Sequence, residues 1–442
     1  MTTVAVLAVG RPTFDLVEAT DRVDRASRLL RSRYRVVGDA TLHVEAGHWE
    51  IGEVDAIVLL QATFTDATLP GSFLDEVADV PVVLWAFPEP RTGGRLVLNS
   101  LCGINLTAAA LVSDGWDVRY LYADPDDADC GARLDEAMGG PIPRRPASSA
   151  RPDQRAAGIA GILAAASVGL IGDRPDGFEP CGYTDAELRS LGAHVDRIEL
   201  EELFRRARQV EARRLDVDGV PPTLDPSGVE ATARLHEAMA DLAAERRWDA
   251  VATRCWPECF TEFGGAACAA MGRLSDEGIP GVCEADVFGA LTSIALRACS
   301  GNPVLVADLV DAPADGTLGF WHCGIAPPSM AHPDDPMGYT VHPNRRLPLL
   351  HEFRLRPGRV TIARFSRSGG SLRLVIGAGE ILDRPRPFAG TCAVIQPDTP
   401  SRQVLDTVIA EGLDHHYGIT HGDVAPVMAG LAELLGLEVV AL

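Results

Sequence analysis

The sequence predicts an α/β fold, with two Rossmann-like parallel-sheet domains followed by a mainly β, barrel-like C-terminal domain. Three observations predict it: short β-branched runs alternate with helical patterns, a Pro/Arg/Ser-rich break follows residue 139, and short alternating strands begin at about residue 311. We therefore expect domains at residues 1–150, 151–310 and 311–442. The 442-residue length supports this division, because it exceeds what one hydrophobic core usually serves.

The first domain alternates apolar runs with helical patterns. We predict strands at residues 4–9, 56–60, 80–85 and 117–121, and a helix at residues 16–31. Alternation of this kind is typical of parallel β-α-β units.

The break between the first two domains is the segment GPIPRRPASSARPDQ, residues 140–154, which lacks apolar periodicity and is predicted to be a linker. Beyond it we expect a helix at 155–166, strands at 167–172 and 193–200, and a charged helix at 235–247. The β-α alternation thus resumes in a second α/β domain.

The last domain has a different pattern. Short alternating strands are expected at residues 359–365, 371–376 and 391–396, separated by turn residues and followed by a terminal helix. We therefore predict a mainly β domain.

Charge and composition exclude several partners. The formal net charge of −22 would repel a phosphate backbone, and no Lys/Arg-rich stripe compensates for it, so no nucleic-acid partner is expected. The opening MTTVAVLAVG lacks the basic region of a signal peptide, and the apolar stretch 158–172 is too short to span a membrane. The ten cysteines are scattered singly, as in proteins with reduced thiols. We therefore expect a cytoplasmic protein without a membrane partner.

The stretch from residue 248 to residue 311 carries the candidate chemistry. Its pattern predicts that Trp256, Glu284 and Asp308 each follow or end a strand, so that right-handed crossovers place them at the carboxyl edge of one parallel sheet. Ligands of open α/β sheets bind at that edge. If the strands of Glu284 and Asp308 are neighbours, their carboxylates can share one hard cation.

A single acid at a strand end has a simpler explanation as a helix cap or a loop residue. Asp286 illustrates this, because capping the next helix explains it. Two acids at successive strand ends favour the metal-site interpretation instead.

A second candidate region is EGLDHHYGITHGD, residues 411–423. Neutral imidazole is a good ligand for Mn, Fe, Co, Ni or Zn, and nearby carboxylates favour the harder ions of that series. A histidine pair in a loop is otherwise ordinary polar surface.

Taken together, these residues resemble the L-fucose isomerase and L-arabinose isomerase superfamily. Glu284 and Asp308 are 24 positions apart, the spacing of the two manganese-binding acids in fucose isomerases, and HHYGIT resembles the motif that carries the third ligand. The resemblance makes His416 that ligand and His415 its neighbour. It also includes the third-domain segments LRPGRVTIARF, GAGEI and FAGT.

The resemblance implies further site residues. Arabinose isomerases have another histidine after the second acid, and His322 of FWHCG is the candidate, as a ligand or a group that polarises the substrate. Trp256, Glu258 and Asn99 are candidate substrate-binding residues. Packing and capping would explain Trp256 and Glu258 equally simply, and loop structure is the simpler explanation of Asn99.

The resemblance implies a metal-dependent aldose-ketose isomerase that acts on an open-chain sugar through a cis-enediol. The expected cofactor is Mn²⁺, or another divalent cation such as Mg²⁺ or Co²⁺, with Glu284 and Asp308 as the catalytic pair. A homo-oligomer, hexameric or trimer-based with sites near subunit interfaces, is also implied.

Two alternatives remain open from the sequence: a metal-dependent aldolase, and a non-catalytic sugar-binding regulator with the same fold. The substrate is open too, among pentoses, 6-deoxyhexoses and modified sugars such as sulfonated hexoses. Arg345 and Arg346 are candidates to lie near the far end of the sugar.

Overall fold

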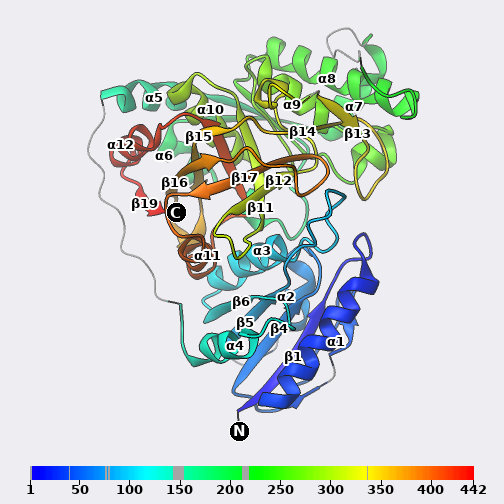
Figure 1. The fold of residues 1–442 in the computed structure, drawn as a ribbon. Helices are drawn as coiled ribbons and strands as arrows, with labels where there is room; N and C mark the ends of the chain where they lie inside the picture. Colours follow the sequence, from blue (N-terminus) through cyan, green and yellow to red (C-terminus); the bar gives the residue numbers. More distant parts are fainter. Residues whose placement is uncertain are drawn as a thin grey trace.

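The computed structural model describes residues 2–38, 40–74, 77, 80–142, 154–211, 219–335 and 337–442. These residues are organised around two parallel sheets and a closed C-terminal barrel, which confirms the predicted fold class. In Figure 1 the N-terminal sheet lies at the bottom and the barrel lies in the middle. Most of the predicted linker lies outside the described residues.

The N-terminal sheet has the strand order β2-β1-β4-β5-β6, with β3 paired to β1, and every pairing is parallel. Its strands are β1 (Thr3–Val9), β2 (Arg35–Val37), β3 (Leu42–His43), β4 (Ala56–Gln61), β5 (Val82–Ala86) and β6 (Val118–Tyr122). The helices are α1 (Leu16–Arg33), α2 (Thr68–Leu74), α3 (Ser100–Ser113) and α4 (Cys130–Gly139).

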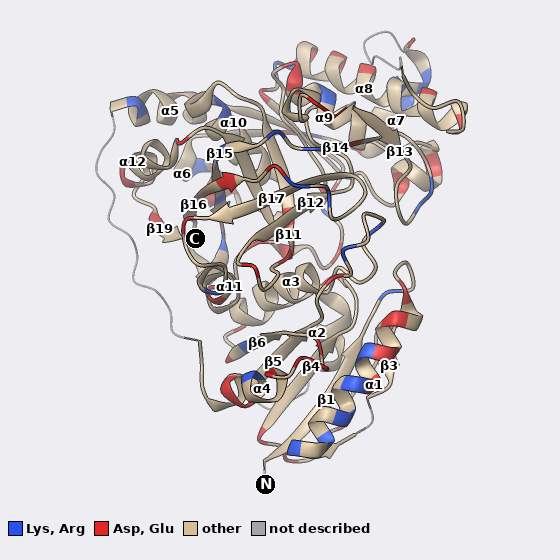
Figure 2. Ribbon diagram, in the orientation of Figure 1, with Lys and Arg blue, Asp and Glu red and all other residues tan. Residues whose placement is uncertain are grey.

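Helix α1 illustrates how the local sequence builds this layer. The Asp15 carboxylate accepts hydrogen bonds from the backbone N–H groups of Val17 and Glu18, which satisfies donors at the helix N-terminus. Buried residues recur at helical spacing on its inner face, at Ala19, Val23, Ala26 and Leu30. Charged residues cover its outer face, with acidic residues only in the N-terminal part and basic residues continuing to the C-terminal end (Figure 2).

The second parallel sheet has the order β10-β9-β7-β8. Its strands are β7 (Ser167–Ile171), β8 (His194–Ile198), β9 (Ala250–Thr253) and β10 (Gly281–Val282). The helices are α5 (Gln154–Ala164), α6 (Asp185–Leu191), α7 (Leu200–Gln209), α8 (Pro226–Arg246), α9 (Cys268–Asp276) and α10 (Val287–Ser300), with short helical turns η1 (Glu179–Cys181) and η2 (Cys259–Phe263).

The C-terminal sheet has the order β13-β14-β17-β12-β11-β18-β15-β16-β19, and a further β16–β17 pairing closes it into a barrel. Its strands are β11 (Val304–Asp311), β12 (Leu318–His322), β13 (Gly338–Thr340), β14 (Leu350–Arg354), β15 (Gly358–Ser366), β16 (Arg373–Ile381), β17 (Thr391–Pro397), β18 (His416–His421) and β19 (Glu438–Ala441). Two helices, α11 (Ser401–Ala410) and α12 (Ala425–Leu435), and the turns η3 (Pro328–Met330) and η4 (Ser368–Gly370) complete this part.

One expectation about the topology is wrong. The strand that carries Asp308 is not a neighbour of the Glu284 strand in a parallel sheet, because β11 pairs antiparallel with β12 and β18 in the barrel. Every residue of β11 is buried. A strand buried on both faces has the same apolar pattern in a parallel sheet and in a barrel, so the pattern alone did not distinguish them. The domain limits at residues 150 and 310 remain a prediction.

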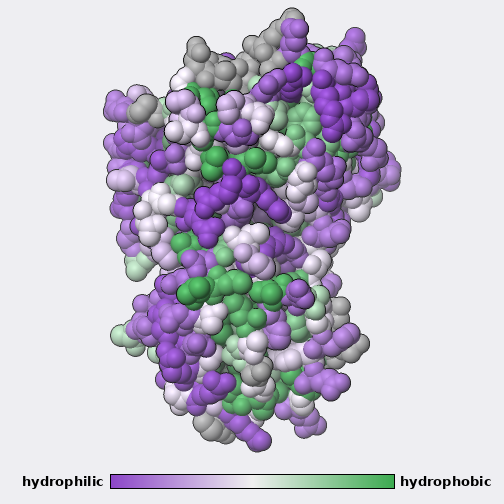
Figure 3. All heavy atoms as spheres, turned by 90° about the vertical axis from the view of Figure 1, so that its right-hand side faces the viewer, coloured by the Kyte–Doolittle hydropathy of each residue, from purple (hydrophilic) through white to green (hydrophobic). Residues whose placement is uncertain are grey.

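The surface and the helices bear on membrane contact. Figure 3 shows a largely hydrophilic face, with apolar side chains gathered near the waist between the lower and upper parts. Every helix among the described residues is too short or too polar to cross a bilayer.

Candidate active site and metal centre

The candidate ligands meet where the edge of the second sheet faces the barrel. Glu284 follows β10, whereas Asp308 lies within β11 and His416 begins β18. Asp308 and His416 are directly opposite each other in the antiparallel β11–β18 ladder, so their side chains share one face of the barrel wall. The antiparallel pairing of barrel strands therefore brings candidate ligands together, which neighbouring strands of a parallel sheet were expected to do.

The backbone at Glu284 is unusual. Glu284 and Ala285 have φ angles of 58° and 54°, in the left-handed region that residues with a Cβ avoid at a cost of roughly 1 kcal/mol each. Hydrogen bonds from the N–H of Ala285 to the carbonyl of Thr253 and from that of Asp286 to the carbonyl of Cys283, both 3.2 Å, hold this turn. Such conformations cluster at functional sites, and here the turn aims the Glu284 carboxylate at the barrel.

The ligand atoms converge on one imidazole. His416 Nε2 lies 3.3 Å from Glu284 Oε2 and 3.5 Å from Asp308 Oδ1. The His416 side chain is only 1% exposed, and the two carboxylates are 13% and 12% exposed. Three residues far apart in the chain thus form one compact, buried cluster.

His416 is held in the orientation that a metal ligand needs. Its Nδ1–H donates to Asp286 Oδ2 at 2.9 Å, which leaves Nε2 to face the two carboxylates and to bind a metal ion once this atom has lost its proton. The same Asp286 oxygen accepts a hydrogen bond from Arg364 at 2.5 Å, and both of these side chains are buried.

The capping explanation of Asp286 was incomplete. Its Oδ1 does accept from the N–H of Gly289 at 2.9 Å and so caps α10, as predicted. Its other oxygen positions His416, a role that the sequence did not reveal because the two residues are 130 positions apart.

His322 is arranged differently. Its Nδ1 accepts a hydrogen bond from the N–H of Cys323 at 2.8 Å, so in the neutral ring the proton is on Nε2, which lies 2.9 Å from Cys283 Sγ. Burial lowers the pKa of His322 to about 3, and the nearby charge of His416 acts in the same direction. His322 is therefore neutral and presents a donor, which favours a polarising role over that of a ligand.

The pKa values of His416, Asp308 and Glu284 are shifted because these groups are buried close to one another. Burial disfavours the charged form of His416, but its hydrogen bond to Asp286 and the charge of Glu284 raise its pKa to about 9. Burial raises the pKa of Asp308 to about 7 against the opposing charge of His416, and Glu284 adds to the rise. Burial also opposes ionisation of Glu284, yet its hydrogen bond with His415 and the charge of His416 lower its pKa.

The cluster fits a divalent cation. Two carboxylates and one imidazole are the donor set of the harder transition ions such as Mn²⁺. Asp308 Oδ1 is buried and accepts no hydrogen bond from the part of the chain that the structure describes, although a buried carboxylate oxygen normally has a partner. A cation beside His416 would satisfy this oxygen. Possible metal-binding groups also include Cys181 and His415 with Glu284 and His416, and Cys283 with His322 and His416.

A cavity of about 440 Å³ opens onto this cluster, a size that suits a small ligand. Its wall includes Glu284, Asp308 and His322, and also Arg11 and Arg345. The chain thus brings groups from the N-terminal layer, the second sheet and the barrel together around one space.

Asn99 lines the cavity, as expected for a substrate-binding residue. The Glu89 carboxylate accepts hydrogen bonds from the backbone N–H groups of Leu98 and Asn99, which fixes the turn before α3. Asn99 is buried, and its Oδ1 accepts no hydrogen bond from the described residues. A ligand hydroxyl is a suitable partner for that oxygen.

The other two substrate-binding candidates, Trp256 and Glu258, differ in whether they line the cavity. Trp256 lines the cavity, whereas Glu258 does not. Glu258 forms an ion pair with Arg254 at 2.7 Å.

Sequence reasoning missed some residues around the cavity. His415, interpreted as a mere neighbour, lines the cavity and places Nε2 3.1 Å from Glu284 Oε2. Cys283 contacts His322, and Arg11 lines the cavity wall. The doubled histidine was the only local signal among these, because the cysteine and the arginine lie in no recognisable motif.

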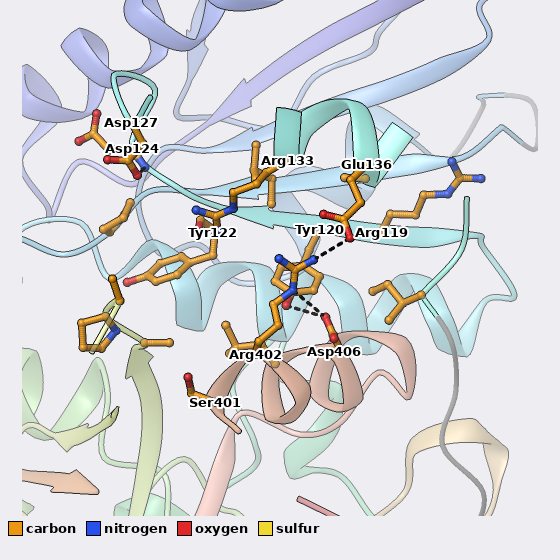
Figure 4. A pocket seen from close by; sticks show the side chains of 18 of the residues that line it. Arg119, Tyr120, Tyr122, Asp124, Asp127, Arg133, Glu136, Ser401, Arg402 and Asp406 are labelled. Atoms are coloured by element: carbon orange, nitrogen blue, oxygen red, sulfur yellow. Dashed lines mark hydrogen bonds and ion pairs between the residues drawn. The ribbon is translucent and has the colours of Figure 1, made fainter. Parts of the chain in front are cut away.

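A larger cavity of about 770 Å³ lies between β6, α4 and α11 (Figure 4). Its charges are mostly paired within the wall: Arg402 lies 3.4 Å from Glu136 and 3.6 Å from Asp406, and Tyr120 donates to Asp406 at 2.8 Å. The predicted site residues do not line it, so the cluster at Glu284 remains the candidate site.

Comparisons with known proteins agree with this geometry. Residues 350–442 match the family model described as "L-fucose isomerase, C-terminal domain". A protein of Alkalicoccus urumqiensis called sulfoquinovose isomerase is 33% identical over 399 residues, covering 87% of this chain and 86% of the relative. Proteins of the same name from Clostridium sp. (strain MSTE9) and Priestia aryabhattai are 30% and 27% identical, each over 98% or more of both chains.

These matches cover nearly the whole chain and confirm the resemblance that the sequence motifs indicated. Relatives that carry an isomerase name over such a length also confirm the predicted enzyme class. The chain therefore belongs to the fucose isomerase-like family and is an isomerase, that is, an intramolecular oxidoreductase.

Proposed function

We propose that this chain is a metal-dependent aldose-ketose isomerase whose substrate is a sulfonated hexose, sulfoquinovose. The observation that carries the proposal is the convergence of Glu284, Asp308 and His416 on one point beside a sugar-sized cavity. The names of the relatives support the substrate.

The two carboxylates provide the proton transfers that isomerisation requires. An aldose becomes a ketose when the proton on C2 moves to C1 and a hydroxyl proton moves between O2 and O1, through a cis-enediol. Glu284 and Asp308 both line the cavity, so their oxygens can accept and return these protons. A divalent cation, when bound, would supply Lewis-acid polarisation of the sugar oxygens.

The neighbouring residues keep this pair in place. Asp286 fixes the His416 ring, and His415 holds the Glu284 carboxylate. His322 Nε2–H is a neutral donor that could stabilise charge on a sugar oxygen.

The test is turnover with and without metal. The purified chain would be stripped with a chelator and incubated with sulfoquinovose plus Mn²⁺, Mg²⁺, Co²⁺ or no metal, and ketose formation followed by NMR. We expect metal-dependent formation of the ketose, strongly reduced in Glu284→Gln and unchanged in Glu262→Gln, since Glu262 is exposed and does not line the cavity.

Full activity without metal, or in Glu284→Gln, would remove the proposal. Triose products in place of a ketose would identify an aldolase instead.

The assembly and location remain part of the proposal. We infer a homo-oligomer, hexameric or trimer-based, with sites near subunit interfaces, and a cytoplasmic location. Light scattering of the purified chain would measure its assembly.

A further inference from the structure

Two arginines lie close to one tryptophan in the cavity wall, and among the described residues neither forms an ion pair with Glu284 or Asp308. Arg11 Cζ lies 5.2 Å from the centre of a Trp256 ring, and Arg345 Cζ lies 5.7 Å from one. All three residues line the 440 Å³ cavity that Glu284 and Asp308 also line. The cavity therefore has an anionic part and a cationic part.

The Arg11 guanidinium and the Arg345 backbone are held by their surroundings. Arg11 follows β1 and forms an ion pair with Asp66, and its guanidinium also lies 5.5 Å from the Phe64 ring. Arg345 lies in a tight turn in which the N–H of Arg345 donates to His342 Nδ1 at 3.2 Å and the N–H of Arg346 donates to the His342 carbonyl at 2.8 Å. These contacts fix the Arg11 guanidinium and the turn that carries Arg345 at the cavity before a ligand enters.

The charges at this place do not cancel. Asp66 neutralises Arg11, but no carboxylate among the described residues forms an ion pair with Arg345. Burial lowers the pKa of Arg11 although Asp66 raises it, and Arg345 adds to the lowering, so the two cations affect each other. One net positive charge faces the cavity, and it matches one monovalent anion.

From this arrangement we infer that Arg11, Trp256 and Arg345 bind the sulfonate group of the substrate. The inference rests on the proposed function and adds the residues that select the sulfonated sugar. A sulfonate is ionised at every physiological pH and offers three acceptor oxygens, which planar guanidinium groups bind with paired N–H donors. The Trp256 ring provides an apolar wall beside them.

The charge distribution also sets the direction in which the sugar enters. The carboxylates of Glu284 and Asp308 repel an anion, whereas Arg345 attracts it. A hexose with a sulfonate on C6 therefore places C6 at the arginines and its C1–C2 end at the carboxylates. This is the orientation that isomerisation requires.

The test compares a sugar with and without the sulfonate. The full-length, metal-loaded protein would be assayed with sulfoquinovose, with 6-deoxyglucose and with glucose 6-phosphate. In Arg345→Gln we expect kcat/KM for sulfoquinovose to fall by about 10- to 100-fold, as for loss of a hydrogen bond to a charged group, while that for 6-deoxyglucose changes by less than about threefold. In Arg345→Lys the fall in kcat/KM for sulfoquinovose should be intermediate, since lysine keeps the positive charge but lacks the paired N–H donors of the guanidinium.

Arg346→Gln is the matched control, because Arg346 is the next residue in the same turn, carries the same charge and does not line the cavity. Arg346→Gln should leave kcat/KM unchanged for sulfoquinovose and for 6-deoxyglucose. An equal loss for both sugars in Arg345→Gln, or an equal loss in the control, would overturn the inference. Wild-type preference for glucose 6-phosphate over sulfoquinovose would overturn it in favour of a phosphate site.

A binding measurement separates this inference from the proposed function. Calorimetric titration of sulfoquinovose into wild type, Arg345→Gln and Arg346→Gln reports affinity whether or not the sugar is converted. Weaker binding in Arg345→Gln alone supports the sulfonate site even if no ketose forms. Equal affinity in all three proteins rejects it even if ketose forms.

Discussion

The two parts of the cavity are built in different ways. At the acidic part, Asp308 and His416 lie on paired barrel strands, and His416 is fixed by the buried Asp286. At the cationic part, Arg11 and Arg345 lie in loops, and Arg345 is exposed. Groups that move protons or hold a cation need positions fixed within about 0.5 Å, which strands provide, whereas loops tolerate change. The difference predicts that reaction chemistry resides in buried groups fixed by the barrel strands and by the hydrogen-bonded turn of Glu284, and substrate choice in the more exposed loops.

The largest effect is expected at the acidic part. Asp308→Asn removes a proposed proton carrier and a proposed metal ligand at once, so kcat should fall on the order of 10³-fold, with the fold retained because the side chain keeps its shape. Steady-state kinetics and circular dichroism would check this. If Asp308→Asn raised KM and left kcat unchanged, Asp308 would belong with the substrate-binding groups, and the proposed difference between the two parts of the cavity would be wrong.

Metal affinity should depend strongly on pH. In the metal-free chain the pKa values of His416 and Asp308 are raised to about 9 and about 7, so both groups retain protons near neutral pH. A metal ion must displace these protons, so its affinity rises with pH. Between pH 6 and pH 8 we expect Mn²⁺ affinity to increase by about 10²- to 10³-fold. Calorimetry in buffers of different ionisation enthalpy would measure the proton release, and pH-independent affinity would contradict the assignment.

Asp286→Asn tests the support of the metal ligand. Losing the carboxylate that accepts from His416 Nδ1 should weaken Mn²⁺ binding by about 10- to 100-fold. His322→Gln should change Mn²⁺ affinity by less than about threefold, because Nε2 of His322 carries a proton. Equilibrium dialysis against Mn²⁺ would compare the two variants. A large loss in His322→Gln would make His322 a ligand instead.

The smallest effect is expected from Asn99. Asn99 lines the cavity and its Oδ1 accepts no hydrogen bond from the described residues, so Asn99→Ala should raise KM by about three- to tenfold through one lost hydrogen bond, with kcat nearly unchanged. Glu258→Gln serves as the comparison and should change KM by less than about twofold, since Glu258 pairs with Arg254 outside the cavity. Equal changes in the two variants would restore Glu258 as a substrate-binding candidate.

Much of the fold was predictable because it depends on local patterns. The predicted helix after Asp286 is α10, which this residue caps and Gly301 ends in the left-handed conformation. The short strand before Glu284 is β10, and the predicted strand before Asp308 is part of β11. Caps, turns and apolar periodicity act within a few residues, so one sequence suffices to detect them.

The placement of β11 and the partners of the site residues were not predictable in this way. Asp286 positions a histidine 130 residues away, and Arg11 reaches Trp256 from the opposite part of the chain. No local pattern encodes such pairs, because they depend on which strands and loops pack together.

The sequence by itself determined the elements with strong local patterns, such as β1, α1 and α10, and singled out Glu284 and Asp308, with His416 added by the family resemblance. Only the tertiary structure decided that a barrel strand, rather than a parallel neighbour, carries Asp308, and that two arginines line the same cavity. The physical reason is that helix hydrogen bonding, capping and apolar periodicity are set by residues close in the chain, whereas strand pairing and convergence on a cavity are set by long-range packing.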